Sequence, residues 1–301
     1  MAEQIIAEQI IAEPAADYAD KKKKIGGMEL CAQGTAPYLM FPALAGTGIV
    51  RHGFSTKLGG VSQGSCATMN LSFERGDDPK AVRENYRRIA SSIGFSVEDL
   101  VFSKQTHTTN IRLVTEKDRG AGYSRPVGYT DVDGLITNIP NLVLTTFYAD
   151  CVPLYFVDPA RRVIALVHSG WRGTVGKIGD KAVRMMREHF GSDPADILAA
   201  VGPSIGQECY EVSRDVVDAF RDEFTEAQMS ELAEQKENGK YQLDLWKANQ
   251  IILREAGIRK EHLFTAGICT CCQKDWLFSH RATNGKRGNL AAFLELLPEQ
   301  A

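Results

Sequence analysis

Short runs of β-branched and aromatic residues follow one another through the middle of the chain. Their length of four to six residues and the turn residues between them, such as Asp158-Pro159, are typical of β-strands. Strands are therefore predicted over residues 142–147, 153–157, 162–167, 197–201 and 263–268. The middle of the chain is strand-rich.

Other segments carry apolar residues at helical spacing. Residues 78–93 predict a helix with Pro79 in its first turn, and apolar residues recur at helical spacing over 175–190. Ser213 is placed to cap a further helix, and residues 246–256 predict one that ends before Gly257. Because strands outnumber a regular strand–helix alternation, we expect an α+β fold with mixed β-sheets flanked by helices, and no doubly wound sheet.

The first residues differ from the rest of the chain. The five letters AEQII occur at residues 2–6 and again at 7–11, and Pro14 and the lysine run Lys21–Lys24 follow. An isolated helix this short is marginal in water, so residues 1–27 are predicted to be a flexible leader. From residue 28 onward no linker-like stretch occurs, which predicts one catalytic domain over residues 28–301.

Composition narrows the class of protein. With 44% hydrophobic and 24% charged residues the chain is typical of globular proteins, and its net charge of −3 gives no reason to expect nucleic acid as a partner. No run of 18 apolar residues is present, so no membrane partner is expected. The start lacks the pattern of a secretory signal, and seven cysteines, an odd number, fit reduced thiols in the cytoplasm.

Three side chains stand at the ends of strand-like segments: His107, Cys151 and His168. Two imidazoles and a thiolate suit zinc, and three protein ligands leave a fourth position for water, as in catalytic zinc sites. Asp133 and Asp150 are candidates to orient the ligands or to move protons. Spacing alone is not specific, and at this point it favours two hydrogen-bonded histidines and a buried cysteine over a metal site.

Several sequence words in a fixed order resemble a known family. They are Phe54-Ser55-Thr56, Gly59-Gly60-Val61-Ser62, Lys104-Gln105-Thr106-His107, Asp133-Gly134-Leu135-Ile136-Thr137, Ala149-Asp150-Cys151-Val152-Pro153, His168-Ser169-Gly170-Trp171-Arg172-Gly173, Gly202-Pro203-Ser204-Ile205-Gly206 and Cys209-Tyr210-Glu211-Val212. From about residue 50 to 290 the chain resembles the family first described as multicopper polyphenol oxidases (laccase domain) and now regarded as purine nucleoside phosphorylases with adenosine deaminase activity.

The resemblance implies both a site and reactions. It implies that His107, Cys151 and His168 hold a catalytic zinc in a mixed sheet sandwich. It implies phosphorolysis of adenosine, inosine, guanosine and methylthioadenosine to the base and the (methylthio)ribose-1-phosphate, and hydrolysis of adenosine to inosine. The chain departs from the family at Lys57, where arginine is common, and lysine loses the planar fork of a bidentate phosphate contact.

Further residues are candidates for catalysis or substrate binding. Asp150 and Cys151 are the catalytic candidates. Arg172 and Arg281 match phosphate oxygens in geometry, and Gln105 and Asn70 match a base or ribose. A surface ion pair or a turn-stabilising role is an equal interpretation of these four. Cys269, Cys271 and Cys272 form a C-x-C-C run without a second cysteine pair, so thiols rather than a structural zinc are expected there, and Cys209 is expected in the core.

Two rival functions use the same residues. Cys151 as a nucleophile with a histidine base is typical of amidases, and some bacterial relatives are described as peptidoglycan-editing amidases. Two histidines and a cysteine are also the ligand set of blue-copper sites, so copper is possible in vitro, although polyphenol oxidation by several coppers requires more than the six histidines present. The sequence makes no prediction of the oligomeric state or of the preferred nucleoside.

Overall fold

The computed structural model describes residues 23–32 and 34–299. Most of the predicted leader, residues 1–22, lies outside the described residues. Its last part does not behave as a leader, because Lys23–Ile25 forms strand β1, which pairs with β2 (Met28–Cys31). The Gly27 N–H also donates to the Ala266 carbonyl at 2.9 Å. The predicted boundary after residue 27 therefore lies too far along the chain, because the described residues before it are already part of the fold.

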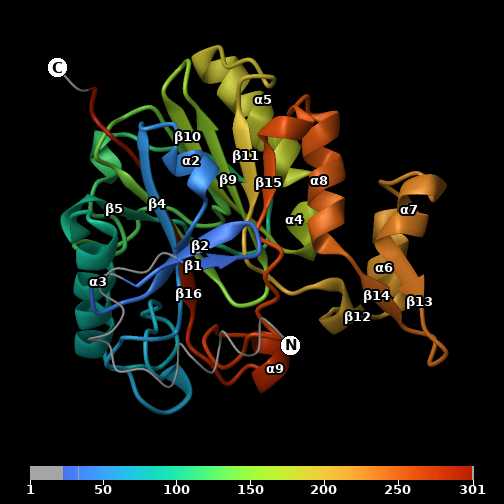
Figure 1. Ribbon diagram of the computed structural model, residues 1–301, viewed down its shortest axis with the longest axis horizontal. Coiled ribbons are helices and arrows are strands. Elements are labelled where there is room, and N and C mark those ends of the chain that lie inside the picture. The colour runs from blue at the N-terminus through green and yellow to red at the C-terminus, as the bar shows by residue number, and fades with distance from the viewer. Residues whose placement is uncertain (1–22, 33, 300–301) are drawn as a thin grey trace.

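Two sheets form the body of the molecule (Figure 1). The first has seven strands in the order β1, β2, β3 (Tyr38–Met40), β4 (Val50–Ser55), β16 (Leu290–Leu296), β8 (Val143–Tyr148) and β5 (Leu100–Phe102). The second has six, in the order β15 (Leu263–Thr265), β11 (Leu198–Val201), β9 (Val152–Asp158), β10 (Val163–Ser169), β7 (Gly134–Thr137) and β6 (Ile111–Leu113). Parallel and antiparallel pairs occur in both sheets, so each sheet is mixed.

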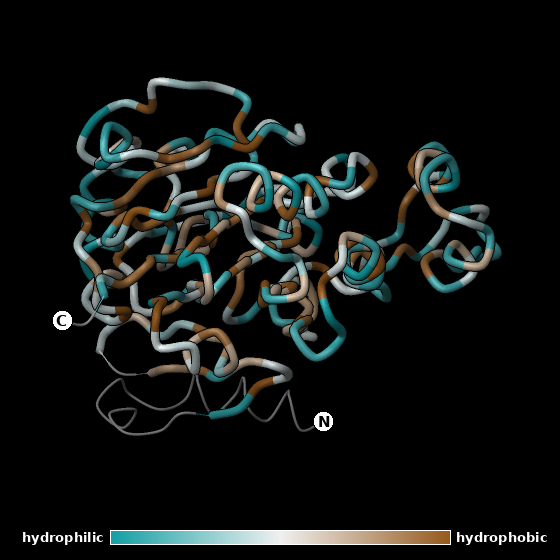
Figure 2. The backbone as a smooth tube through the Cα atoms, turned by 90° about the horizontal axis from the view of Figure 1, so that it is seen from above, coloured by the Kyte–Doolittle hydropathy of each residue, from teal (hydrophilic) through white to brown (hydrophobic). Residues whose placement is uncertain are grey.

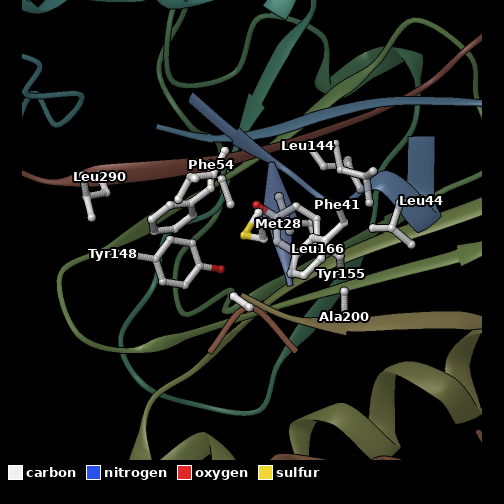
Figure 3. Packing of buried hydrophobic residues seen from close by; sticks show 14 of the residues in the cluster. Met28, Phe41, Leu44, Phe54, Leu144, Tyr148, Tyr155, Leu166, Ala200 and Leu290 are labelled. Atoms are coloured by element: carbon white, nitrogen blue, oxygen red, sulfur yellow. The ribbon is translucent and has the colours of Figure 1, made fainter. Parts of the chain in front are cut away.

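The sheets pack face to face through the alternation of side chains along their strands. In β10, Ile164 and Leu166 belong to the apolar cluster between the sheets, whereas Val163, Ala165 and Val167 belong to the cluster on the opposite face. Figure 3 shows the inner cluster, with Leu144 and Tyr148 of the first sheet near Tyr155 and Leu166 of the second. Each sheet therefore buries both of its faces.

Helices cover the two outer faces. On the first sheet, α3 (Pro79–Ile93) packs its buried side chains against Ala291 and Phe293 of β16. On the second, α5 (Ile178–Phe190) and α8 (Leu245–Glu255) cover β9, β10 and β11. Shorter helices are α2 (Pro42–Ala45), α4 (Trp171–Val175), α6 (Arg214–Arg221), α7 (Glu226–Leu232) and α9 (His280–Thr283), with 3₁₀ turns at Gly64–Cys66, Val97–Asp99, Glu116–Asp118, Gln207–Cys209 and Lys260–His262.

A small lobe projects from this sandwich. It consists of α6, α7 and a three-stranded sheet in the order β12 (Glu211–Val212), β14 (Tyr241–Leu243) and β13 (Ala233–Gln235). Figure 2 shows the lobe extending to one side of the body. Val217, Phe220 and Leu243 of the lobe join the apolar cluster beneath α8, so the lobe and the body share one core.

The predicted α+β class with mixed sheets flanked by helices in one domain is confirmed. The helical pattern over 175–190 is broken at Lys177, whose positive φ of 52° separates α4 from α5. Ser213 occupies the N-cap of α6, but its hydroxyl contacts the Asp215 carboxylate and makes no capping bond to the backbone. Among the described residues no helix is long and apolar enough to cross a membrane.

The packing between the sheets predicts a large effect of truncating Leu166. Its side chain is fully buried between Tyr155 and Leu135 of the neighbouring strands. Leu166→Ala should lower the free energy of unfolding by about 2–5 kcal/mol, as cavity-forming core substitutions do. Urea unfolding measures this, with Leu113→Ala on the half-buried edge strand β6 as the control. Equal losses in the two variants would contradict the two-sheet core.

Candidate metal centre and active site

Cys151 lies where the chain passes from one sheet to the other. Strand β8 of the first sheet ends at Tyr148, and β9 of the second begins at Val152. The turn between them contains Asp150 with a positive φ of 90°, a conformation that costs energy for a residue with a Cβ atom. This turn places the Cys151 thiol at the end of both sheets, half-buried.

His168 reaches the same end of the second sheet from β10. In the antiparallel pairing of β9 with β10, His168 lies opposite Pro153, two residues after Cys151. Its ring is 3% exposed, and its Nδ1 lies 2.8 Å from Oδ1 of Asp133. Because Nδ1 is engaged there, Nε2 is the ring nitrogen that remains for a cation.

His107 comes from the loop between β5 and β6 and has a positive φ of 65°. Asp133 holds this loop as well. Its carboxylate accepts from the backbone N–H groups of Thr106, His107 and Thr108 at 3.2, 3.0 and 2.9 Å, and from the Thr108 hydroxyl at 2.8 Å. One buried carboxylate therefore positions both histidines.

The three side chains converge. One ligand atom from each of His107, Cys151 and His168 lies within 4.8 Å of the others, and Nε2 of His107 lies 3.8 Å from Sγ of Cys151. A tetrahedral zinc with ordinary bond lengths separates sulfur and nitrogen ligands by about 3.6 Å. A Cβ atom on Gly170 would lie 2.9 Å from Cδ2 of His107 and 3.2 Å from Sγ of Cys151, so this position requires glycine. The residues present fit a zinc ion.

The charges in the cluster favour a thiolate. Burial raises the pKa of the Cys151 thiol, but the charge of His168 and the hydrogen bonds from both histidines outweigh burial and lower it to about 6. Burial lowers the pKa of His168, but the Cys151 thiolate and Asp133 raise it to about 9. Burial raises the pKa of Asp133, but the hydrogen bond to His168 and the His168 charge lower it to about 2. A thiolate is the form of cysteine that binds metals or attacks electrophiles.

A pocket of about 600 Å³ opens above these ligands. His107, Cys151 and His168 form part of its wall, and apolar rings from Phe73, Phe102, Phe147 and Tyr148 line another part. Three cationic side chains also line it, Arg75, Lys104 and Arg287, together with Glu74, whose carboxylate pairs with Lys104. The pocket therefore combines a metal-ligand set, aromatic surface and positive charge.

Of the predicted substrate-binding residues, Gln105 lines this pocket and Asn70 does not appear in its wall. The Gln105 amide is held by Phe147, whose N–H donates to Oε1 at 2.6 Å and whose carbonyl accepts from Nε2 at 2.8 Å. Asn70 is fully buried, and both its amide oxygen and its amide nitrogen make two hydrogen bonds within the protein. Asn70 therefore shapes the backbone and has no free donor or acceptor for a ligand.

Arg172 and Arg281 gather around Tyr210 outside the pocket wall. Both lower the Tyr210 pKa, although burial, the largest influence, keeps it raised. The Arg172 guanidinium lies 4.2 Å from the centre of the Trp171 ring, and that of Arg281 donates to the carbonyls of Cys209 and Glu211. In this arrangement the two guanidinium groups bind protein groups, and a phosphate contact by either stays a prediction.

Asp150 is adjacent to Cys151 in sequence, but its carboxylate is engaged elsewhere. Oδ1 accepts from the Thr270 hydroxyl at 2.7 Å, and Oδ2 accepts from the Arg281 backbone N–H at 2.7 Å. Its carbonyl also accepts from the Ile205 N–H at 2.9 Å. These bonds fix the strained turn that carries Cys151, which makes Asp150 a positioning residue here. Its predicted role in proton transfer stays a prediction.

Sequence reasoning missed Arg75 and Arg287 as pocket residues. Neither lies within a word that resembles the family, and each reaches the pocket from a loop far from the metal ligands in sequence. His52, by comparison, is a buried histidine whose Nε2 accepts from the Phe41 N–H at 2.9 Å. Burial accordingly lowers its pKa to about 4, although the bond to Phe41 opposes this.

Comparison with known proteins agrees with this geometry. Residues 51–297 match the family described as multi-copper polyphenol oxidoreductase laccase. The chain belongs to this family. It is 38% identical over 245 residues to the purine nucleoside phosphorylase YlmD of Bacillus subtilis strain 168. The matched region covers 80% of the chain and 87% of that protein.

Other relatives carry related names. The purine nucleoside phosphorylase of Deinococcus radiodurans is 37% identical over 86% of the chain and 93% of its own length. Adenosine deaminase RL5, from an unknown prokaryotic organism, is 33% identical over 76% of the chain and 87% of its own length. The crystal structure of YlmD from Geobacillus stearothermophilus superposes with a TM-score of 0.81 at 35% identity, over 92% of the chain and 98% of that structure. These relatives carry the names of enzymes that act on nucleosides.

The close approach of Gly170 to two ligands predicts the effect of adding one methyl group. Gly170→Ala should weaken zinc binding at His107, Cys151 and His168 by about 10-fold or more, because its Cβ displaces the ligands. Competition with a chelating dye measures the affinity. Gly128→Ala is the matched control, since a Cβ atom there meets nothing within 4 Å. Unchanged affinity in Gly170→Ala would show that the ligands do not share a cation at this place.

The thiolate character of Cys151 predicts its reactivity in metal-free protein. The rate of Cys151 alkylation by iodoacetamide, followed by peptide mass spectrometry, should rise with pH around a midpoint near 6. Asp133→Asn removes a group that raises the His168 pKa, so the midpoint should move to higher pH in that variant. A midpoint near 9 in the unmodified protein would contradict the proposed charge pairing.

Proposed function

We propose that this protein is a zinc-dependent purine nucleoside phosphorylase that also deaminates adenosine. Purine nucleosides, including methylthioadenosine, and phosphate are the proposed substrates, and His107, Cys151 and His168 are the proposed zinc ligands. The observation that carries the proposal is the convergence of these three ligands on the wall of one pocket with aromatic and cationic surfaces. The relatives named above support it.

Zinc held by His107, Cys151 and His168 would supply a Lewis acid, which would polarise a substrate oxygen or lower the pKa of a water molecule to about 7. The residues of the chain do the remaining work. Asp133 fixes the two imidazoles, and Gly170 allows them to approach Cys151. Asp150 holds the turn that presents the thiolate.

The cationic side of the pocket supports phosphate as the second substrate. Burial takes Arg287 partly out of water and lowers its pKa to about 10, and the charge of Arg75 adds to that effect. Its Nε is buried with no hydrogen-bond partner among the described residues. A phosphate beside Arg75 and Arg287 would relieve this repulsion and accept the unused donor, while Lys104 is paired with Glu74.

The aromatic side supports a purine. Phe73, Phe102 and Phe147 offer ring faces and edges, and a pocket of about 600 Å³ lies within the range of about 300–1,000 Å³ typical of small-molecule sites. In phosphorolysis a phosphate oxygen forms the bond to C1′ of the ribose as the bond from C1′ to the purine nitrogen breaks. The base leaves with the electron pair and takes up a proton.

Deamination of adenosine is the second proposed reaction of the same pocket. Water adds at C6 of adenine, and ammonia leaves after taking up a proton. The specific observation that favours it is the 33% identity to a relative named adenosine deaminase. We also infer a cytoplasmic location, which is supported by the lack of any disulfide between cysteines in the part of the chain that the structure describes.

The rival functions remain distinguishable. Cys151 and His107 would also serve a cysteine-dependent amidase that edits peptidoglycan, since a thiolate near an imidazole is a common nucleophile. A copper polyphenol oxidase would use the same three ligands with copper. Zinc that is bound in stoichiometric amount to the freshly purified protein and is lost in Cys151→Ser argues against both rivals, because a cation then occupies the thiolate and that cation is zinc rather than copper.

Incubation with adenosine tests the proposal. With phosphate present, free adenine and ribose-1-phosphate should appear, and without phosphate only inosine and ammonia, as followed by chromatography. Cys151→Ser should lower both rates by about 100-fold or more, because it removes a zinc ligand. Cys66→Ser, at a buried cysteine outside the pocket wall, is the control. Absence of every one of these products would refute the nucleoside function.

The phosphate subsite is tested within the same assay. Arg287→Gln should raise the KM for phosphate by about 10-fold and leave the rate of deamination nearly unchanged, since water needs no guanidinium. Arg184→Gln, at an exposed arginine on α5 paired with Asp180, is the control. An unchanged KM for phosphate in Arg287→Gln would place the anion elsewhere.

A further inference from the structure

A second group of thiols lies apart from the candidate metal centre. Cys209 ends the 3₁₀ turn Gln207–Cys209, while Cys269 and Cys272 belong to the loop that follows β15. The three sulfur atoms lie within 4.8 Å of one another, and those of Cys209 and Cys272 are 3.4 Å apart. The sequence predicted Cys209 in the core. The fold instead brings it beside Cys269 and Cys272, so the C-x-C-C run gains a further thiol that lies far from it in sequence.

The backbone around Cys269 is arranged for a negatively charged sulfur. The N–H groups of Gly206 and Cys272 both donate to Sγ of Cys269, at 3.2 and 3.4 Å. Hydrogen bonds to a charged form stabilise that form, and neutral thiols need no such donors. Two of these donors on one sulfur are therefore an observation independent of the clustering.

The spacing also suits a cation. Thiolates bound to one tetrahedral zinc, with Zn–S bonds of about 2.3 Å, lie about 3.8 Å apart. The observed separations of 3.4 Å and at most 4.8 Å bracket this value. Cys209 and Cys269 are half-buried and Cys272 is exposed, so an ion can enter from solvent.

We propose that Cys209, Cys269 and Cys272 bind a second metal ion, a soft divalent cation such as zinc, in a structural site made of three thiolates. Each thiol loses a proton to the solvent as its sulfur forms a bond to the cation, and no electron is transferred. The fourth position is open to water or to Cys271, whose thiol contacts Cys209. This site rests on its own residues and does not depend on the proposed nucleoside chemistry.

Without a cation, the cluster favours neutral thiols. Burial raises the pKa of the Cys209 thiol, and the neighbouring Cys272 and Cys269 raise it further. Burial likewise raises the pKa of Cys272. Three thiolates in one place repel one another, and a divalent cation converts this repulsion into attraction.

The second site would stiffen the turn that carries Cys151. Thr270 lies between two cysteines of the run and donates its hydroxyl to Asp150 at 2.7 Å. Arg281 links the same parts, because its guanidinium donates to the Cys209 carbonyl at 3.1 Å and its N–H donates to Asp150 at 2.7 Å. A cation joining Cys209 to the 269–272 loop would therefore fix both groups that hold the Asp150 carboxylate.

Cobalt(II) is the probe that tests the site, in full-length, reduced, chelator-treated protein carrying Cys151→Ser. This background removes a ligand of the first centre, so failure of the nucleoside function cannot affect the result. We expect one cobalt per chain with the intense ultraviolet absorption of thiolate-to-cobalt charge transfer. Adding Cys272→Ser should abolish tight binding, and adding Cys66→Ser, a buried cysteine outside the cluster, should leave it unchanged.

Thermal unfolding with zinc gives a second measurement. Zinc should raise the Tm of Cys151→Ser but not that of Cys151→Ser/Cys272→Ser, which also shows that both variants fold. The proposal is overturned if the Cys151→Ser protein shows no charge-transfer band, or if Cys272→Ser leaves the band unchanged. It is overturned as well if mass spectrometry finds Cys209 and Cys272 joined by a disulfide under reducing conditions, because that bond removes two of the three ligands.

Discussion

One buried carboxylate, that of Asp133, holds the candidate active site together. It is fully buried, bonds to the ring of His168, and accepts three backbone N–H groups from the loop that carries His107. Removing a buried charged partner typically costs about 3–5 kcal/mol, because it leaves the other groups unpaired. The native pKa of Asp133, about 2, lies below its ordinary value of about 3.9. Its ionised form therefore stabilises the fold at pH values above 4, and this contribution is lost as the pH falls toward 2.

The sandwich explains how distant residues meet. His107 and Cys151 are 44 positions apart, and the chain between them forms β6, β7 and β8 before it changes sheets at the turn that precedes β9. His168 lies opposite the start of β9 by strand register. The site therefore lies between the ends of the two sheets, where the strands stop. The chain there requires a positive φ at Asp150 and a glycine at position 170.

Much of the fold followed from local patterns. The runs that form β8, β9 and β10 are almost entirely buried, which is why their composition identified them. The three-residue strands β1 and β3 carry too few residues for any periodicity, so they were not predicted. The break at Lys177 was not predicted either, because a residue with positive φ does not interrupt the helical spacing of the apolar residues around it.

The site was predictable only in part. The resemblance to a family pointed to His107, Cys151 and His168, and the fold brings them together. Neighbours that are far apart in sequence left no pattern that could be recognised in the sequence. Arg287 was therefore not predicted in the pocket, and Cys209 was not predicted beside Cys269 and Cys272. Asn70 and Arg281 show the converse, since the Asn70 amide oxygen accepts from the Asn289 N–H and the Arg281 guanidinium donates to the Cys209 carbonyl, and only the tertiary structure brings these groups together.

The central claim is that His107, Cys151 and His168 share one zinc ion. Anomalous diffraction from crystals of zinc-loaded protein, recorded on both sides of the zinc absorption edge, tests it most directly. The account predicts an anomalous peak about 2.0–2.3 Å from one nitrogen of each histidine and from the Cys151 sulfur. Absence of a peak there in zinc-loaded crystals, with the three side chains in the positions described, would contradict it.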